Sequence, residues 1–248
     1  MTADRPHQPP SSSGEIGPVA DPVASIDDPR AITILTTEHW SLLSARSLAY
    51  NEAFTRGGMF LTFLSMSFVA LALFSSAMGF SDDFLTVTAV VLAFDFVIGL
   101  TTYARITGAN LDDMRAVHGM ARIRHGYTQI APVVTPYFTA AIHDDPAGIG
   151  LTYGDQSTTM PGVFFYGLTT SGGMIGLILA MVGGVLTAVL ALLAGIGGAA
   201  VAIGIGGALV VFGGLVWFTV GSVPREQGKL PALFPSPTSD AEGTTDRP

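Results

Sequence analysis

The sequence predicts an all-α membrane protein with four transmembrane helices arranged as two hairpins. The mean hydropathy of its 248 residues is +0.51 and only 12% are charged, unlike an ordinary soluble domain. Four apolar runs are each long enough to cross a hydrocarbon core of about 30 Å. All eleven Lys and Arg residues lie outside these runs: before Gly57, between Arg105 and Arg124, or after Pro224.

Residues 1–35 are expected to form a disordered cytoplasmic tail, because large apolar side chains are scarce there. A helix is predicted from Thr36 or Thr37, with Glu38 in its first turn. Two interpretations of this amphipathic helix stay open. It lies among the lipid headgroups, or it packs in the cytoplasm against the later Arg-rich helix. Its mostly apolar stripe consists of Trp40, Leu43, Ser47, Tyr50 and Phe54.

The first transmembrane hairpin is predicted from spans at 57–80 and 84–104, joined by the acidic turn 81–83. An Arg-rich cytoplasmic helix follows and is broken or kinked at Pro132 and Pro136. Residues 36–142 therefore form one predicted unit: the amphipathic helix, the two spans and the Arg-rich helix.

The second hairpin is predicted within 172–221, which carries no charge and is rich in glycine. Its spans are placed near 172–194 and 199–221, with a turn at the glycines between them. Residues 143–171 are expected to form a cytoplasmic loop. Residues 222–248 are expected to form a disordered cytoplasmic tail.

The distribution of basic residues also orients the chain. Both turns that join paired spans lack Lys and Arg, whereas the tails and the 105–142 segment hold all of them. The positive-inside rule then predicts both termini in the cytoplasm of a bacterium, with a multi-pass topology in the plasma membrane.

Asp95 is the one acidic residue near the middle of a predicted span. A charge there costs about 2.5–3.5 kcal/mol on insertion scales, so its face is expected to point into a helix bundle. Thr88 and Thr102 share that face, and Ser65 and Ser67 are candidate hydrogen-bond partners. Asp95 is either an ion or proton site, or a neutral donor that joins helices.

A candidate interaction face is predicted on the cytoplasmic side. The spacing of Arg115, His118, Arg122 and His125 puts these four residues on one side of a helix, where they could bind anionic headgroups or a phosphate. The alternative is a solvated face paired with acidic residues of the first helix. The first helix contributes Glu38, His39, Arg46 and Glu52.

Several classes of function find no support in the sequence. The chain has no cysteine, no catalytic elbow of the G-x-S-x-G type, and no His pair at metal-ligand spacing. A net charge of −8 with few basic residues argues against nucleic-acid binding. No cofactor or metal is predicted, and the protein is expected not to be an enzyme.

Small residues repeat every four positions in the last two spans, which allows close helix approach. Within one chain this repeat packs the third span on the fourth. Between chains it favours a homo-oligomer, since there are more small faces than one hairpin needs. The strips are Gly172, Gly176, Ala180, Gly184 and Ala188; Gly198, Ala202 and Gly206; and Ala200, Gly204 and Ala208.

The segments 36–73 and 109–138, together with the His-Asp-Asp of 143–145, resemble a family of actinobacterial integral membrane proteins with no assigned activity. The resemblance covers most of residues 33–195, and its most distinctive pieces are Glu38-His39-Trp40, Arg46, Asn51-Glu52 and Asn110–Arg115. It implies a membrane location. The layout also resembles the two-span SLATT membrane effectors of bacterial conflict systems in architecture only, and the extra Gly-rich hairpin departs from them.

Three functions are consistent with the sequence. The leading one is a non-enzymatic oligomerising scaffold or sensor that contacts the bilayer and a cytoplasmic protein partner. The second is a small ion or proton channel or transporter built around Asp95. The third is an enzyme at the cytoplasmic lipid interface, with a cleft that gathers Glu38, His39, His118 and Arg122.

Overall fold

The chain is all-helical in the part that the computed structural model describes, which comprises residues 26, 28–153, 167, 170–227 and 230–237. The α-helices are α1 (Ala31–Met78), α2 (Asp82–Ile130), α3 (Pro146–Tyr153), α5 (Ser171–Leu193) and α6 (Ala200–Gln227). Two 3₁₀ helices are η1 (Pro132–Tyr137) and η2 (Gly197–Ala199). No strand occurs among these residues.

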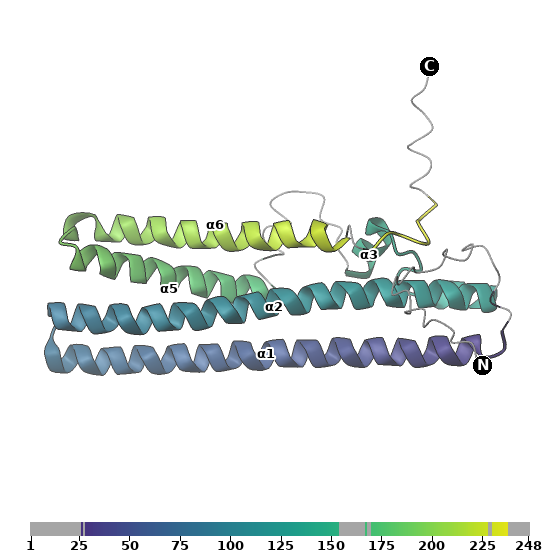
Figure 1. Ribbon diagram of the computed structural model, residues 1–248, viewed down its shortest axis with the longest axis horizontal. Coiled ribbons are helices and arrows are strands. Elements are labelled where there is room, and N and C mark those ends of the chain that lie inside the picture. Colours follow the sequence, from purple (N-terminus) through teal and green to yellow (C-terminus); the bar gives the residue numbers. More distant parts are fainter. Residues whose placement is uncertain (1–25, 27, 154–166, 168–169, 228–229, 238–248) are drawn as a thin grey trace, which may run out of the picture.

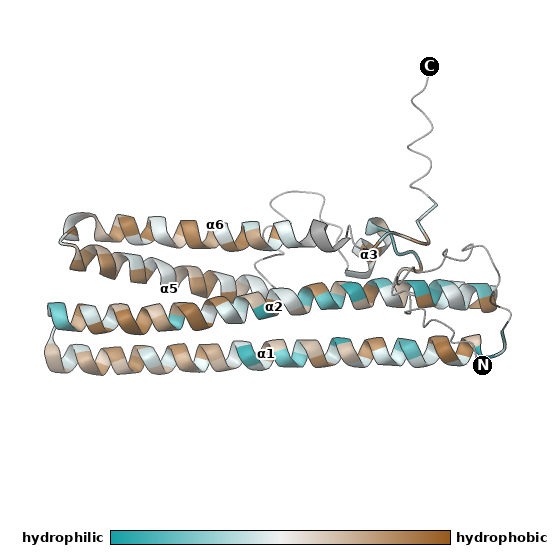
Figure 2. Ribbon diagram, viewed as in Figure 1, coloured by the Kyte–Doolittle hydropathy of each residue, from teal (hydrophilic) through white to brown (hydrophobic). Residues whose placement is uncertain are grey.

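Helices α1 and α2 form a long antiparallel pair, and the shorter hairpin of α5 and α6 covers one half of it (Figure 1). Four helical segments are long and apolar enough to cross a membrane: α1, α2, α5 and the stretch 197–222. The half of α1 and α2 beside α5 and α6 is mainly hydrophobic, whereas the other half carries most of the hydrophilic positions (Figure 2). We call that other half the cytoplasmic arm (residues 31–56 of α1 and 105–130 of α2), after the predicted orientation.

Helix α1 is much longer than a bilayer is thick. Its 48 residues extend about 72 Å, against a hydrocarbon core of about 30 Å. A span that starts at Gly57, as predicted, would leave the first half of α1 outside the hydrocarbon as one continuous helix. Trp40 lies about 25 Å along the helix from Gly57, farther than a headgroup layer extends. The structure thus favours the second interpretation of the amphipathic segment, packing against α2.

A single seam of α1 faces its neighbours along both the arm and the apolar half. Its members recur in steps of three or four residues, the spacing of helices packed side by side. The predicted stripe is shifted from this seam, because Trp40 and Phe54 are exposed. The partly or fully buried members are Leu35, His39, Leu42, Arg46, Ala49, Ala53, Gly57, Phe60, Leu64, Ser67 and Leu71.

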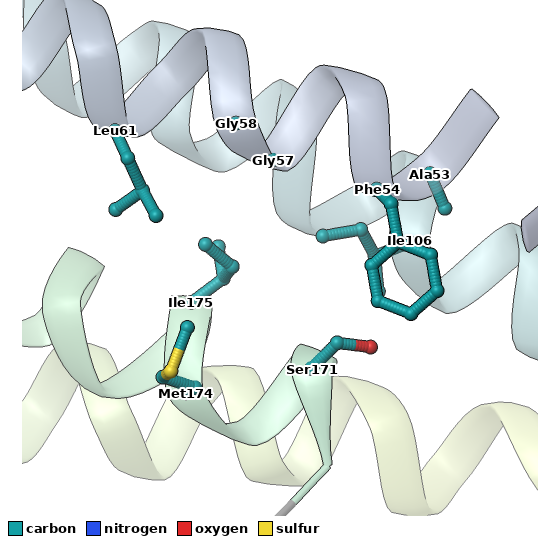
Figure 3. A pocket seen from close by; sticks show the side chains of 9 residues that line it. All are labelled: Ala53, Phe54, Gly57, Gly58, Leu61, Ile106, Ser171, Met174 and Ile175. Atoms are coloured by element: carbon teal, nitrogen blue, oxygen red, sulfur yellow. The ribbon is translucent and has the colours of Figure 1, made fainter. Parts of the chain in front are cut away.

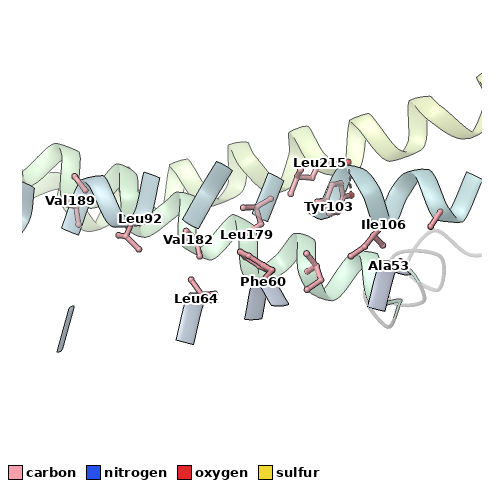
Figure 4. Close-up of a cluster of buried hydrophobic side chains, with 13 residues drawn as sticks. Ala53, Phe60, Leu64, Leu92, Tyr103, Ile106, Leu179, Val182, Val189 and Leu215 are labelled. Atoms are coloured by element: carbon pink, nitrogen blue, oxygen red, sulfur yellow. Dashed lines mark hydrogen bonds between the residues drawn. The ribbon is translucent and has the colours of Figure 1, made fainter. Parts of the chain in front are cut away.

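The main core lies where α1, α2 and α5 meet, with α6 alongside (Figure 4). Phe60, Leu92 and Leu179 are at most 1% exposed. A Cβ at Gly99 would lie 2.8 Å from both Leu179 and Phe60, so this position requires glycine. The Tyr103 hydroxyl ties α2 to α6 through contacts of 3.2 Å to the Leu215 carbonyl and 2.7 Å to Thr219.

The α5–α6 hairpin uses small residues on both sides. A Cβ at Gly204 would lie 2.9 Å from the Ala188 Cβ and 3.0 Å from the Gly184 carbonyl oxygen. Of the predicted strips, the one containing Gly204 therefore packs within the chain, while Ala202 and Gly206 are exposed. Gly195 supplies the turn with φ +77°, a conformation that favours glycine.

Several predicted boundaries differ from the observed ones. Helix α1 begins at Ala31 instead of Thr36 or Thr37, because Leu35 packs on α2 at Gly126 and stabilises an earlier turn. Helix α3 occupies part of the predicted 143–171 loop, and α6 continues past residue 221 to Gln227. The expected disorder of 1–25 and 238–248 lies outside the described residues.

The predicted C-terminal tail is partly wrong. Residues 230–237, here called the C-terminal segment, pack on the end of the cytoplasmic arm and on the residues around α3. Their backbone makes specific hydrogen bonds that composition cannot reveal. The segment lies at the same end of the molecule as the start of α1 (Figure 1).

Candidate functional site

Asp95 lies inside the bundle, as its sequence position predicts, and is 0% exposed. The Ser67 hydroxyl on α1 donates to Asp95 Oδ1 at 3.0 Å. The other carboxyl oxygen, Oδ2, has no hydrogen-bond partner within the described part of the chain. One hydroxyl compensates a buried carboxyl group poorly, so Asp95 is the least satisfied polar group in the spans.

The other predicted members of this site behave differently. Thr88 and Thr102 are buried on the same face of α2, but their hydroxyls donate to the backbone carbonyls of Phe84 and Ile98, both at 2.8 Å. Ser65 is exposed and donates to the Leu61 carbonyl at 2.8 Å, so it is not a partner of Asp95. The polar contact inside the bundle therefore consists of Asp95 and Ser67.

An apolar groove of about 260 Å³ opens between α1 and α5 (Figure 3). Glycines on α1 leave the space: a Cβ at Gly58 would meet nothing within 4 Å. No charged side chain lines the groove, and the hydroxyl of Ser171 is the one polar side-chain group among its lining residues. The lining residues are Ala53, Phe54, Gly57, Gly58, Leu61, Ile106, Ser171, Met174 and Ile175.

A network of three charges marks the point where the arm leaves the apolar half. Glu52 accepts from Arg105 of α2 at 2.6 Å and from Arg56 at 3.0 Å. The hydrogen bond from Arg105 is the main reason that the pKa of Glu52 is lowered. All three side chains are partly exposed, so this network contributes little stability and fixes the relative position of α1 and α2.

A buried ion pair joins the two helices further along the arm. Arg46 of α1 pairs with Asp113 of α2, which is 1% exposed. The Tyr153 hydroxyl of α3 donates to the same carboxylate at 2.6 Å. Burial, and then the bond to Asp113, raise the pKa of Tyr153. Three helices thus converge on Asp113.

The predicted face of Arg115, His118, Arg122 and His125 is not one open surface. His118 is buried and its Nδ1 lies 2.9 Å from the Met114 carbonyl. Arg122 binds Asp144, and His125 is covered by the ring of Phe234 at a centroid distance of 4.0 Å. Arg115 pairs with Asp112 at 2.7 Å. None of the four pairs with Glu38 or Glu52 in any hydrogen bond or ion pair seen among the described residues.

The first-helix members of the predicted interaction face are also dispersed. Glu38 is exposed, whereas His39 packs near Tyr127 with ring centroids 6.2 Å apart. Burial, and then the charge of Arg124, lower the pKa of His39. In the described part of the chain, no hydrogen bond or ion pair links Glu38, His39, His118 and Arg122, so the cleft required by an interfacial enzyme does not form from them.

Asp144 holds together the contacts at the end of the arm, and it is 1% exposed. Burial alone would raise its pKa, but backbone N–H bonds from Leu233 and Phe234 and the Arg122 guanidinium together lower it. The sequence placed Asp144 only within a His-Asp-Asp run. Its partners lie far along the chain, so no local signal identified it. Among the described residues, no group of three His, Cys, Asp or Glu side chains could hold a metal ion.

Comparison with known proteins identifies no relative of the chain. No protein-family model, no curated protein and no solved structure matches the chain.

Proposed function

We propose that this chain is a non-enzymatic scaffold or sensor of the bacterial plasma membrane, with both termini in the cytoplasm. The observation that carries the proposal is the unbroken passage of α1 and α2 from the apolar half into the cytoplasmic arm. The buried pair Arg46–Asp113 and its bond to Tyr153 stiffen that arm. A conformational change at the apolar end or at the polar end of the molecule would be transmitted along these two continuous helices.

The surface of the arm supports a cytoplasmic protein partner. Large apolar side chains stand out from α1 away from its packed seam: Trp40 is 63% exposed, and Leu48 is 72% exposed. Exposed apolar groups on an otherwise polar helix are typical of interaction surfaces. Ile34 and Phe54 add to this surface.

The outer face of α6 supports a homo-oligomer. A Cβ at Gly206 or Gly213 would meet nothing within 4 Å, and Leu209 between them is 67% exposed. Ala202, Gly206 and Gly213 form a small-residue strip that no described helix of the same chain covers, and Leu209 protrudes beside it. Another copy could approach closely there.

The oligomer is tested by counting copies in nanodiscs through single-molecule photobleaching. We expect more than one copy per particle for the wild type, and at least a ten-fold weaker association for Gly206→Leu. Gly58→Leu is the matched control, because that position is also an exposed glycine with open space around it. A wild-type chain that is monomeric at every protein density would contradict the proposal.

A channel or transporter around Asp95 is the second candidate, favoured by the unpartnered Oδ2 atom. The intrachain bond from Ser67 favours a structural role instead. Proteoliposome flux of protons and monovalent cations separates the two. The scaffold proposal expects no flux above empty vesicles. Flux that is abolished by Asp95→Asn, but retained in Ser67→Ala, would instead establish a pathway through Asp95.

A further inference from the structure

The C-terminal segment is bound through its backbone to one carboxylate. Asp144 accepts from the Leu233 N–H at 3.0 Å and the Phe234 N–H at 2.8 Å. The Asp144 N–H in turn donates to the Phe234 carbonyl at 3.3 Å. The pairing is made where the segment bends at Leu233 and Phe234, and every one of these bonds contacts main-chain atoms of the segment.

Side chains on both sides complete the contact. The Phe234 ring stacks on His125 with an interplanar angle of 18°. Arg122 Nη2 donates to the Pro231 carbonyl at 2.7 Å, and the Ser236 hydroxyl donates to Asp145 Oδ1 at 2.8 Å. The segment is thus held at its start, middle and end.

The receiving surface is held in place by bonds of its own. Arg122 Nε donates to Asp144 Oδ2 at 2.7 Å, and Asp145 Oδ1 accepts from the Gly148 N–H at 3.1 Å at the start of α3. Gly148 fits tightly, because an added Cβ would collide with the His143 carbonyl oxygen. The carboxylate, guanidinium and imidazole that contact the segment are therefore positioned by α2 and α3.

We infer that Arg122, His125, Asp144 and Asp145 form a peptide-binding site, that the C-terminal segment fills it as a latch, and that a Leu-Phe-Pro-type segment of a cytoplasmic partner takes its place. Asp144 and Arg122 contact only main-chain atoms of the segment. A peptide of different sequence can therefore make the same contacts. The aromatic ring that stacks on His125 supplies selectivity. Prolines at 231, 235 and 237 restrict the backbone and reduce the entropy lost on binding.

This inference rests on the proposed scaffold role, since it names the partner chemistry of the same cytoplasmic end. The latch is tethered to α6 by a very short connection, so its effective concentration is on the order of millimolar. A partner peptide must compete with it. Substitutions in the latch that weaken it, and leave the receiving surface unaltered, should therefore increase the binding of an added peptide.

The test measures fluorescence anisotropy of a labelled peptide with the sequence of residues 229–240, added to the full chain in nanodiscs. Two latch variants are used: Phe234→Ala removes the stacked ring, and Ser236→Asp places a carboxylate against Asp145. We expect both to bind the peptide at least ten-fold more tightly than the wild type. Ser236→Asn, which adds no charge, should lie closer to the wild type.

A peptide with Ala at the position of Phe234 is the control on the ligand side, and it leaves the folded chain unchanged. It should bind at least ten-fold more weakly to both latch variants. Equal affinity for wild type and latch variants, or equal affinity of the two peptides, would overturn the inference. A chain that is monomeric yet binds the peptide would contradict the oligomer and leave the peptide site intact.

Discussion

Three buried carboxylates differ in how their charge is compensated. Asp113 has a guanidinium and a phenol, and Asp144 has a guanidinium and two backbone N–H groups. Asp95 has one serine hydroxyl. Burying a charge is costly unless it is paired and hydrogen-bonded, so the first two suit ionised side chains and the third suits a neutral one. The residue type, aspartate, does not distinguish the three; their hydrogen-bond partners do.

Arg46→Ala is expected to destabilise the arm strongly, because it leaves the Asp113 carboxylate buried without its cation. A loss of about 3–5 kcal/mol in the free energy of unfolding is typical of such a change. The double variant Arg46→Met/Asp113→Leu should lose less, since no buried charge remains. Reversible unfolding in mixed micelles measures both.

The exposed pair Arg30–Asp28 provides the control for that series. Its arginine side chain is 83% exposed, so Arg30→Ala should leave the free energy of unfolding almost unchanged. Equal losses for Arg46→Ala and Arg30→Ala would show that Asp113 does not depend on the ion pair.

The C-terminal segment should loosen in acid through His125. Burial, and then His143, lower the pKa of His125 from 6.5, although the nearby Asp144 opposes the shift. The loosened state binds more protons, so the contact is fully stable above about pH 6.5 and weakens as pH falls through that value toward the lowered pKa. The pKa of Asp144 is below 3.8, so this carboxylate stays ionised throughout that window.

Hydrogen exchange of the Leu233 and Phe234 amides, corrected for the intrinsic pH dependence, measures this effect. Protection should fall between about pH 7.5 and about pH 5.5. His125→Phe keeps a ring against Phe234 and removes one imidazole, while His143, whose Nδ1 lies 3.2 Å from the Phe234 carbonyl oxygen, remains. The protection of this variant should therefore change much less than that of the wild type over that range. A wild-type profile as flat as that of His125→Phe would contradict the role of His125.

At the scale of elements, the spans and the arm follow from the sequence, but the packing faces do not. Apolar length predicts α1, α2, α5 and α6, and prolines predict the end of α2 near Ile130. The stripe through Trp40 and Phe54 predicts the wrong face of α1. The seam consists mainly of aliphatic and small side chains, with His39, Arg46 and Phe60 among its members, whereas Trp40 and Phe54 are exposed.

Glycine at 204 is expected to be essential to the α5–α6 hairpin. Even Gly204→Ala would place a Cβ 2.9 Å from Ala188, and overpacking of this kind costs about 1–3 kcal/mol. Gly214→Ala is the matched control on the same helix, because its Cβ would meet nothing within 4 Å. Unfolding in mixed micelles should show a loss for Gly204→Ala and almost none for Gly214→Ala.

At the scale of the whole molecule, the four candidate spans and the long arm define a multi-pass protein with one large polar end. The predicted orientation places that end in the cytoplasm. The described C-terminal segment and the start of α1 both lie at that polar end (Figure 1). They should therefore be on the same side of the membrane.

The orientation is tested with single cysteines, since the chain has none of its own. Phe80→Cys and Ile196→Cys, in the two short turns, should react with an impermeant maleimide in intact cells. Tyr137→Cys should react only after permeabilisation. Phe80 and Tyr137 are 85% and 81% exposed, so accessibility within the fold does not separate them. The reverse labelling pattern would show that the protein has the opposite orientation in the membrane.

The sequence by itself determined the number of helices able to span a membrane, their approximate ends and the isolation of Asp95, because hydropathy, charge and proline act over short stretches of chain. Only the tertiary structure decided that Ser67 and not Ser65 contacts Asp95, and that Asp113 and Asp144 are centres of the arm. It also showed that residues 230–237 are bound. Each of these depends on contacts between distant segments, whose pairing is set by side-chain packing and hydrogen-bond geometry rather than by local composition.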